Sequence, residues 1–288
     1  MASSFLNERY LPMYEAGLGG TSRIFASFDT VRRELVAVKR IFPEIYPQLK
    51  KKESELLEEL SLRNIEHPHV MGFIDRFWHE GSFCMVTEFI WGMNLEDYLY
   101  RRPLSETLFV RLADQLLAAL GAIHGAGYLH GDVKPQNMMV HFCEAGEVSV
   151  KILDFGLADV LPEEVRFGKE DFMVEELFAT PEYVAPELIR GGTPSELSDL
   201  YGLGQSFFHC LTGEAALVAD TPEKTARMQV STAPPSIMER RPDLPPELAV
   251  WVDRFLVKSP RNRWPTADAA RTKLKQLFPS EVEEPVPA

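Results

Sequence analysis

The segment at residues 128–159 constrains the fold and chemistry of this chain more than any other. It places Asp132, Lys134 and Asn137 close together and sets Asp154 at the end of an alternating apolar run. Phosphoryl transfer needs charge to be neutralised and a hydroxyl to be oriented, and it needs little covalent help from the protein. Asn137 and Asp154 offer hard oxygen ligands that suit Mg²⁺. Asp132 can accept a hydroxyl proton and Lys134 can contact the transferring phosphate, so the segment predicts a phosphoryl-transfer site.

A glycine-containing turn at residues 17–22 lies between two strand-like runs near the N-terminus. Glycines let the backbone approach phosphates closely, but Ser22 stands where the usual third glycine would be, and a plain hairpin turn is the alternative. In the next run, the period of two places Ala37 and Lys39 on one face of a strand. A small residue there can lie over a flat base while the ammonium reaches phosphates. An exposed lysine without such a role is the alternative.

Three further motifs lie downstream of the central segment. Residues 179–187 read ATPEYVAPE, Asp199 opens an apolar helix, and Arg263 lies in the sequence KSPRNRWP. Two of them have a simpler interpretation, because Asp199 could be a helix cap and Arg263 a surface residue.

In this order and spacing, the motifs resemble those of eukaryotic-type (Hanks-type) serine/threonine protein kinase domains, and most of all the bacterial ones. HGDVKPQN at residues 130–137 stands for HRDxKxxN, residues 154–156 for DFG, and residues 179–187 for the peptide-positioning loop with its APE motif. The resemblance covers nearly the whole chain. It implies an α+β, two-lobed fold: a small antiparallel lobe of five strands with helix C, a larger, mainly helical lobe, and ATP between them.

The resemblance also divides the chain. We expect an N-terminal lobe at residues 1–90, a C-terminal lobe at residues 91–279, and an acidic, proline-containing tail at residues 280–288 that is disordered.

The same resemblance assigns roles to individual residues. The expected catalytic residues are Asp132, Lys134 and Asn137, and the expected Mg²⁺ ligands are Asn137 and Asp154. Glu58 is expected to fix Lys39, with Glu55 and Glu59 as fallback partners. The expected nucleotide-binding residues are Gly17, Leu18, Gly19, Gly20, Thr21, Ser22, Ile24, Ala37, Lys39, Glu58, Glu88, Ile90, Met139 and Asp154.

Other residues are expected to support the site. Asp199 should hold the backbone of the catalytic loop, Arg263 should pair with Glu187, and Thr87 should be the gatekeeper. A hydrophobic column is expected from Leu62, Phe73, Phe155 and His130.

Two departures from the family pattern occur together. Gly131 replaces the arginine that pairs with a phosphorylated activation-loop residue in many kinases, and no Ser, Thr or Tyr lies between Leu157 and Phe178. Both halves of a phosphate switch are therefore missing, and the hypothesis is an activation loop that does not need phosphorylation. Gln136, where basophilic kinases often carry an acidic residue, weakens a prediction of arginine-directed specificity.

Composition limits the other classes of function. A net charge of −13 without a basic stripe argues against nucleic-acid binding. The three cysteines are widely separated, which favours reduced thiols in a cytoplasmic protein. We expect no apolar run long enough to span a membrane, and the sequence leaves the oligomeric state open.

The resulting expectation is a serine/threonine protein kinase that uses ATP and Mg²⁺ and acts on Ser or Thr hydroxyls of proteins. A pseudokinase that serves as a binding scaffold is the first alternative, although Lys39, Asp132 and Asp154 are all present. A small-molecule kinase of related fold is the second alternative, and the APE segment disfavours it.

Overall fold

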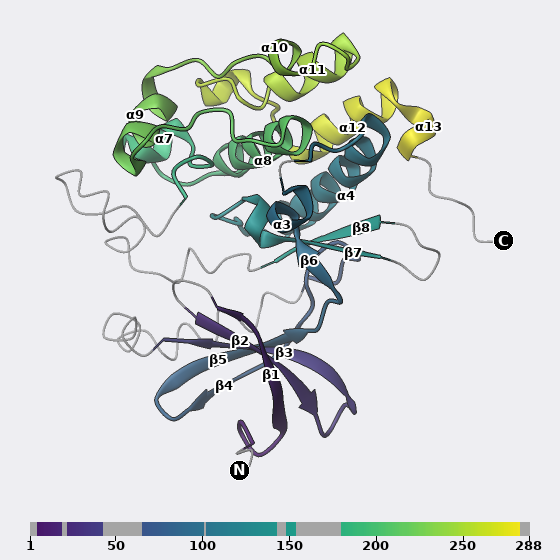
Figure 1. Cartoon of the computed structure of the whole chain (residues 1–288), viewed down its shortest axis with the longest axis vertical. Helices are drawn as coiled ribbons and strands as arrows, with labels where there is room; N and C mark the ends of the chain where they lie inside the picture. Colours follow the sequence, from purple (N-terminus) through teal and green to yellow (C-terminus); the bar gives the residue numbers. More distant parts are fainter. Residues whose placement is uncertain are drawn as a thin grey trace. The chain divides into compact units, whose positions relative to one another are not determined.

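The computed structural model of the chain describes residues 5–18, 22–42, 65–100, 102–142, 148–153 and 180–282. The chain forms two compact units, the first ending at Trp91 and the second beginning at Gly92. Each unit has its own sheet, and the helices of the described residues belong to the second unit (Figure 1).

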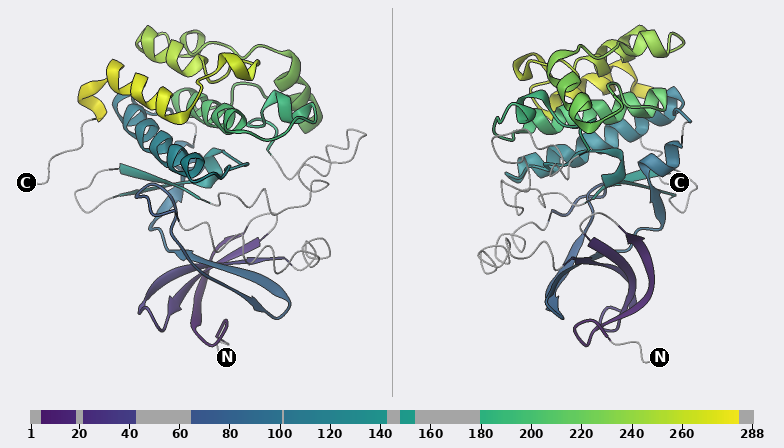
Figure 2. Two further views of the ribbon diagram at one scale, coloured as in Figure 1. Left: turned by 180° about the vertical axis from the view of Figure 1, so that it is seen from behind. Right: turned by 60° about the vertical axis from the view of Figure 1, so that its left-hand side comes forward.

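The first unit is built on one antiparallel sheet with the strand order β1-β2-β3-β5-β4. Its strands are β1 (Tyr10–Leu18), β2 (Ser22–Asp29), β3 (Glu34–Ile41), β4 (Phe73–His79) and β5 (Ser82–Glu88). The sheet curls strongly, as the right-hand view of Figure 2 shows. These strands confirm the expected five-stranded antiparallel sheet, and the helix expected beside it lies outside the described residues.

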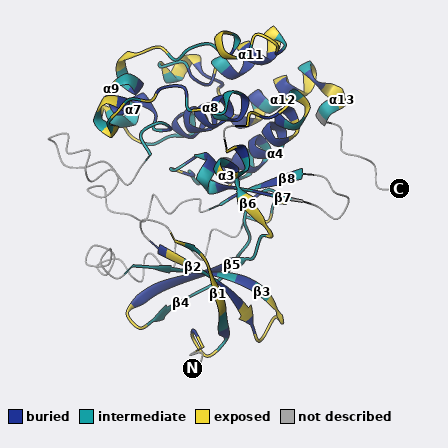
Figure 3. Ribbon diagram, viewed as in Figure 1, coloured by how far each residue is buried: buried dark blue, intermediate teal, exposed yellow. Residues whose placement is uncertain are grey.

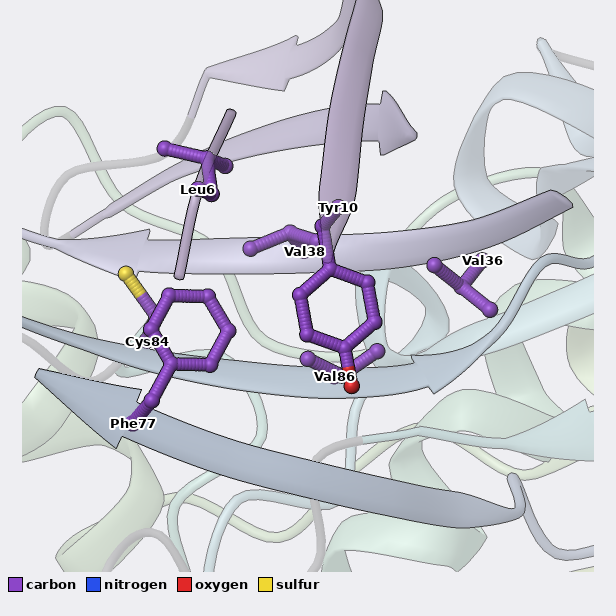
Figure 4. Close-up of a cluster of buried hydrophobic side chains, with 7 residues drawn as sticks. All are labelled: Leu6, Tyr10, Val36, Val38, Phe77, Cys84 and Val86. Atoms are coloured by element: carbon purple, nitrogen blue, oxygen red, sulfur yellow. The ribbon is translucent and has the colours of Figure 1, made fainter. Parts of the chain in front are cut away.

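Seven buried side chains form a core on one face of this sheet: Leu6, Tyr10, Val36, Val38, Phe77, Cys84 and Val86 (Figure 4). The Tyr10 and Phe77 rings stack, with centroids 5.3 Å apart and planes 9° apart. Val36 and Val38 both face this core because side chains alternate along a strand. The alternation therefore turns Ala37 and Lys39 to the opposite face, as the sequence predicts.

A polar cluster adjoins this core. The Arg9 guanidinium donates to both carboxylate oxygens of Asp29 at 2.8 and 2.6 Å, and to Asp75 at 3.1 Å. The Tyr10 hydroxyl donates to the same oxygen of Asp75 at 2.6 Å. Hydrogen bonding from Arg9 lowers the pKa of Asp29 below its ordinary value. The cluster thus satisfies a buried carboxylate and anchors Tyr10 in its stack.

The second unit is organised around helices α4 (Glu106–Gly125) and α8 (Glu196–Thr212), whose buried positions appear as dark bands in Figure 3. Aromatic rings fill the space beside α8, with the Trp251 and Phe255 centroids 5.0 Å apart and Phe207 against both. A Cβ at Gly204 would lie 2.3 Å from the Cβ of Phe255. Glycine at this position therefore allows the helix to approach Phe255 closely.

Helix α4 is long and apolar enough to match a membrane span by length and composition, which differs from the expectation that no run does. However, 67% of its apolar window is buried inside the protein. The helix packs against β8 (Val148–Ile152), α8, α12 (Ala267–Leu277) and α13 (Pro279–Val282). These contacts account for its apolar composition as that of a core helix.

A small antiparallel sheet with the order β6-β7-β8 lies on the other side of α4 from α12 in Figure 1, and β8 contacts α4 directly. The remaining described elements of this unit are β6 (Gly92–Asn94), α3 (Leu95–Leu99), η3 (Pro135–Asn137), β7 (Met138–Phe142), α7 (Pro186–Ile189), α9 (Pro222–Ser231), α10 (Ile237–Arg240), α11 (Pro246–Asp253) and η5 (Pro260–Asn262). Helix α13 carries the ordered chain through Val282, into the first residues of the segment expected to be a disordered tail. Its contact with α4 explains this difference.

We expect Tyr10→Phe to lower the free energy of unfolding of the first unit by about 1–2 kcal/mol, because it removes a hydrogen bond to a carboxylate and keeps the ring stack. Urea denaturation, followed by a probe in the first unit, measures this change. Tyr14→Phe is the matched control, since Tyr14 lies on the same strand and is 50% exposed. Equal stability of the two variants would contradict the role of the Tyr10 hydroxyl.

Candidate active site

In the first unit, strand pairing gathers the expected nucleotide-binding residues on one face of the sheet. Ala37 of β3 lies opposite Ala26 of β2 and Thr87 of β5. Lys39 lies opposite Ile24 in the same ladder. Directly opposed residues in antiparallel strands share a face, so Ile24, Ala37, Lys39 and Thr87 lie together on the face away from the Tyr10 core.

The end of β5 is fixed by Glu88. Its backbone N–H donates to the Gly72 carbonyl at 3.0 Å, and its Oε1 accepts from the Gly72 N–H at 2.7 Å. The following residues carry aromatic side chains, and Phe89 contacts Tyr14 and Trp91 edge to face. Glu88 thus uses its side chain to hold the strand end, which leaves backbone groups of residues 88–90 as candidate partners for a base.

In the second unit, the buried carboxylate of Asp199 holds the catalytic loop. Its oxygens accept from the backbone N–H groups of His130 at 2.8 Å and Gly131 at 2.9 Å. The ring nitrogen Nε2 of His124 lies 2.9 Å from Asp199 as well. Asp199 is 3% exposed and lies in the first turn of α8. The prediction that it supports the loop backbone is confirmed, and the simple helix-cap interpretation is wrong.

A glycine brings α8 and the loop together. A Cβ at Gly202 would lie 2.8 Å from the Val133 carbonyl oxygen and 3.2 Å from the Val133 Cβ. Because this neighbour is backbone, it cannot move aside cheaply. Gly202 therefore permits the close approach that lets Asp199, one turn earlier, reach the loop amides.

The three expected catalytic residues lie in hydrogen-bonding contact with one another. The Asn137 side-chain nitrogen donates to the Asp132 backbone carbonyl at 2.8 Å and to its Oδ2 at 2.9 Å. The Lys134 ammonium lies 2.8 Å from the same Oδ2. The carboxylate of Asp132 is therefore oriented by a neutral donor and a cation, and its side chain remains 40% exposed.

The strand that leads to Asp154 is tied to the same loop. The Leu153 N–H donates to the Asn137 carbonyl, and Nε2 of His130 lies 2.9 Å from the Leu153 carbonyl. Met139 is the second residue of β7 and pairs with Lys151 of β8. The end of the described part of this strand therefore lies beside Asn137.

Residues 180–187 are held from several sides. Arg263 donates to both carboxylate oxygens of Glu187 at 2.6 and 2.8 Å, and it is 1% exposed. This confirms the predicted pair. The Tyr183 hydroxyl lies 2.8 Å from Nδ1 of His209. Burial raises the pKa of Tyr183 and lowers that of His209, so both groups stay neutral over a wide range of pH.

Two polar contacts at this site were not identified from the sequence. The first is the contact of His124 with Asp199. His124 could have been noticed as a polar residue in the last turn of an apolar helix. The second contact is the hydrogen bond from the Gln136 amide nitrogen to Glu96 on α3 at 2.6 Å, and no sequence pattern predicts it. Burial, the largest cause, raises the pKa of Glu96.

Several expected site residues lie outside the described residues. They are Gly19, Gly20, Thr21, Glu58 and Asp154, together with the supporting residues Leu62 and Phe155. Of the expected glycine-turn residues, Gly17 and Leu18 end β1 and Ser22 begins β2, where Ser22 is 4% exposed. Their roles toward a nucleotide therefore stay predictions.

The donor set suits a hard cation. The hydrogen bonds of the Asn137 amide use its nitrogen, so its oxygen is the atom left to ligate a metal. Oxygen ligands from an amide and a carboxylate are those that Mg²⁺ prefers. The described part of the site therefore fits Mg²⁺, with Asp154 as the second predicted ligand.

We expect acid to destabilise the protein partly through His209. Its folded pKa lies below the ordinary value of 6.5 because burial disfavours the charged ring. Between those two values the unfolded chain binds more protons, so this contribution to stability is complete above pH 6.5 and is lost as the pH falls below it. Urea denaturation at pH 7 and pH 5.5 should show a smaller loss in His209→Gln than in the wild type. An identical loss in both proteins would contradict this role.

A model of the protein kinase domain family matches residues 10–274. The chain is 29% identical over 265 residues to the serine/threonine-protein kinase pkn3 of Myxococcus xanthus, an alignment that covers 91% of this chain and 48% of that protein. It is 29% identical over 290 residues to the serine/threonine-protein kinase PknB of Mycolicibacterium smegmatis, with 97% and 44% covered. The chain thus spans less than half the length of these relatives.

Solved structures share the fold. The kinase domain of PknI from Mycobacterium tuberculosis, crystallised as a double mutant, matches with a TM-score of 0.75 at 19% identity, and the match covers 96% of this chain and 98% of that one. Rad53 in complex with AMP-PNP matches with a TM-score of 0.74 at 24% identity, with 93% and 65% covered. With the family match over residues 10–274 and the loop held by Asp199, the chain belongs to the protein kinase domain family.

Proposed function

We propose that this chain is an active serine/threonine protein kinase domain, which transfers the γ-phosphoryl group of ATP to Ser or Thr hydroxyls of proteins. The observation that carries the proposal is the orientation of the Asp132 carboxylate by Asn137 and Lys134 in a loop anchored to Asp199. The names of the relatives, which are serine/threonine-protein kinases, support the same activity.

The second unit supplies the groups for the transfer itself. Asp132 orients the acceptor hydroxyl and takes its proton, since its carboxylate is held in place and partly open to solvent. Lys134 already lies 2.8 Å from Asp132 and stabilises the charge on the γ-phosphoryl group. Asn137 and Asp154 would hold Mg²⁺, and the bound ion would supply positive charge to neutralise the phosphates of ATP.

The first unit supplies nucleotide-binding groups. Lys39 contacts the α- and β-phosphates, fixed by Glu58, while residues 17–22 cover them. Ala37 and Ile24 contact the base, and the backbone of residues 88–90 forms hydrogen bonds with its edge. The shared face of Ile24, Ala37 and Lys39 supports this assignment, because a base and its phosphates can extend along one face of a sheet.

A protein acceptor is favoured over a small molecule by the construction of residues 180–187. Arg263 is buried and its bidentate partner Glu187 is partly buried, and a pair of this kind is costly to build unless the segment it holds must keep one conformation. A segment of this kind suits the positioning of an extended peptide beside Asp132.

The activation segment is proposed to work without phosphorylation. Gly131 has a φ of 80°, a conformation that glycine adopts without steric cost. It presents no guanidinium for a phosphate, and residues 158–177 contain no hydroxyl side chain to receive one. A kinase that lacks both halves of this switch is ordered by packing or by a partner.

We expect Asp132→Asn to lower the rate of phosphoryl transfer by about 10²–10⁴-fold while ATP binding is kept, because the amide cannot accept a proton. Purified protein is incubated with γ-labelled ATP, Mg²⁺ and a generic basic protein, followed by phosphoamino-acid analysis. Asp220→Asn is the control, since Asp220 is a 72% exposed carboxylate paired with Lys224.

Label on Ser or Thr that Asp132→Asn loses and Asp220→Asn keeps would support the proposal. ATP binding with no label in the wild type would favour the pseudokinase scaffold. Label confined to small-molecule acceptors would favour the second alternative.

We expect enzyme produced with a co-expressed phosphatase, and shown by mass spectrometry to carry no phosphate, to start phosphorylating a substrate without a lag. The reason is the absence of an arginine at Gly131 that would need a phosphate partner. A rate that rises only as phosphate appears on Thr180 or its neighbours would contradict the switch-free interpretation.

A further inference from the structure

A chain of hydrogen-bonded side chains crosses the buried interior of the second unit and ends on residues 180–187. The Lys258 ammonium donates to the Tyr201 hydroxyl at 2.8 Å, and that hydroxyl donates to Oε1 of Gln229 at 2.6 Å. Nε2 of Gln229 then donates to the backbone carbonyl of Glu182 at 2.6 Å. The Lys258–Tyr201–Gln229 chain, as we call it, therefore connects α8 and α9 to the residue before Tyr183.

The direction of every bond in this chain is fixed by chemistry. A lysine ammonium only donates and a backbone carbonyl only accepts. The Tyr201 hydroxyl, which also accepts from Gln205 at 3.0 Å, must then give its proton to Gln229. Gln229 can satisfy both neighbours in one orientation only, with oxygen toward Tyr201 and nitrogen toward Glu182. The amide therefore cannot flip without leaving two buried groups mismatched.

The Lys258–Tyr201–Gln229 chain is buried at its centre and tightly packed. Tyr201, Gln205 and Gln229 are each 0% exposed. The Arg263 guanidinium carbon lies 4.6 Å from the centre of the Tyr201 ring, which holds the ring on the side of the Glu187 pair. Burial, with the nearby charges of Arg263 and Arg190, lowers the pKa of Lys258 to about 8. A cation kept at this cost, with neutral hydrogen-bond partners, indicates a specific positioning role.

The Lys258–Tyr201–Gln229 chain complements the Arg263–Glu187 pair. That pair fixes the end of the 180–187 segment through a side chain, while Gln229 fixes its middle through a main-chain carbonyl. Control of a carbonyl sets the orientation of the adjoining peptide unit, and hence the direction in which Tyr183 leaves the backbone. Loss of this bond would let the segment shift by small amounts without unfolding the helices.

We propose that Gln229, oriented by Tyr201 and Lys258, is a positioning residue for the protein acceptor and sets the affinity for the acceptor rather than for ATP. This inference rests on the proposed function, because it assigns residues 180–187 to acceptor binding. Gln229 does not contact the reacting atoms. It acts through the Glu182 carbonyl.

The test compares steady-state kinetics of two variants at Gln229 on a peptide that the wild type phosphorylates. Gln229→Met removes both hydrogen-bonding groups, and Gln229→Glu keeps the acceptor for Tyr201 but loses the donor to Glu182. We expect both to raise the KM for peptide about three- to tenfold, the effect of losing the one hydrogen bond to the Glu182 carbonyl that both variants lack. The kcat, the KM for ATP and the peptide-independent hydrolysis of ATP should stay unchanged.

Two further variants separate positioning from damage to the fold. Thr225→Val is the matched control, because Thr225 is a 1% exposed residue of the same helix whose hydroxyl accepts from Ala219 and not from residues 180–187. Its KM for peptide should match the wild type. Tyr201→Phe keeps the ring and removes only the hydroxyl, so it should raise the KM for peptide even if a Gln229 variant fails to fold.

Each remaining outcome is decisive. An unchanged KM for peptide in folded Gln229 and Tyr201 variants would overturn the inference and leave the proposed function standing. An equal rise in Thr225→Val would also overturn it, since disturbance of α9 would then explain the effect. A wild type that phosphorylates no peptide or protein would overturn the proposed function, and this inference with it.

Discussion

The carboxylate of Asp199 is 3% exposed, and it accepts hydrogen bonds from two consecutive backbone amides of the catalytic loop. A buried carboxylate without partners would be strongly destabilising, so the loop amides and His124 stabilise the acid as much as the acid orders the loop. The remaining geometry of the loop follows. Gly131 takes a positive φ, Val133 packs under Gly202, and Asp132, Lys134 and Asn137 are brought into mutual contact.

Helix α8 can hold the catalytic loop in place because the helix itself is buried on nearly all sides. Its first turn holds the catalytic loop through Asp199, and the next turn presents Tyr201 to the chain that ends at Glu182. The same helix contacts Phe255 closely through Gly204. A single rigid element therefore connects the loop that performs the transfer with the segment proposed to hold the acceptor. Preorganisation of this kind lowers the reorganisation needed during the reaction.

Much of this site could be predicted from the sequence, because its catalytic residues lie in short motifs. Asp132 and Asn137 lie within one loop, and period-two alternation was enough to place Ala37 and Lys39 on one face. The pairs Asp199 with the loop and Arg263 with Glu187 followed from the family resemblance and are confirmed. Roles assigned to Glu58 and Asp154 stay predictions. The Lys258–Tyr201–Gln229 chain could not be predicted, because its bonds join residues 28 and 57 positions apart and depend on how α8, α9 and the loop at Lys258 pack.

Asp199 holds the catalytic loop in its working geometry before any nucleotide binds. Amide hydrogen exchange of His130 and Gly131, measured by NMR in nucleotide-free protein, tests it most directly. We expect slow exchange for both amides in the wild type and much faster exchange in Asp199→Asn. Asp114→Asn, which removes the carboxylate that pairs with Arg271 in the same unit, should leave both amides protected. Exchange in the wild type as fast as in an exposed loop would show that Asp199 does not order the catalytic loop.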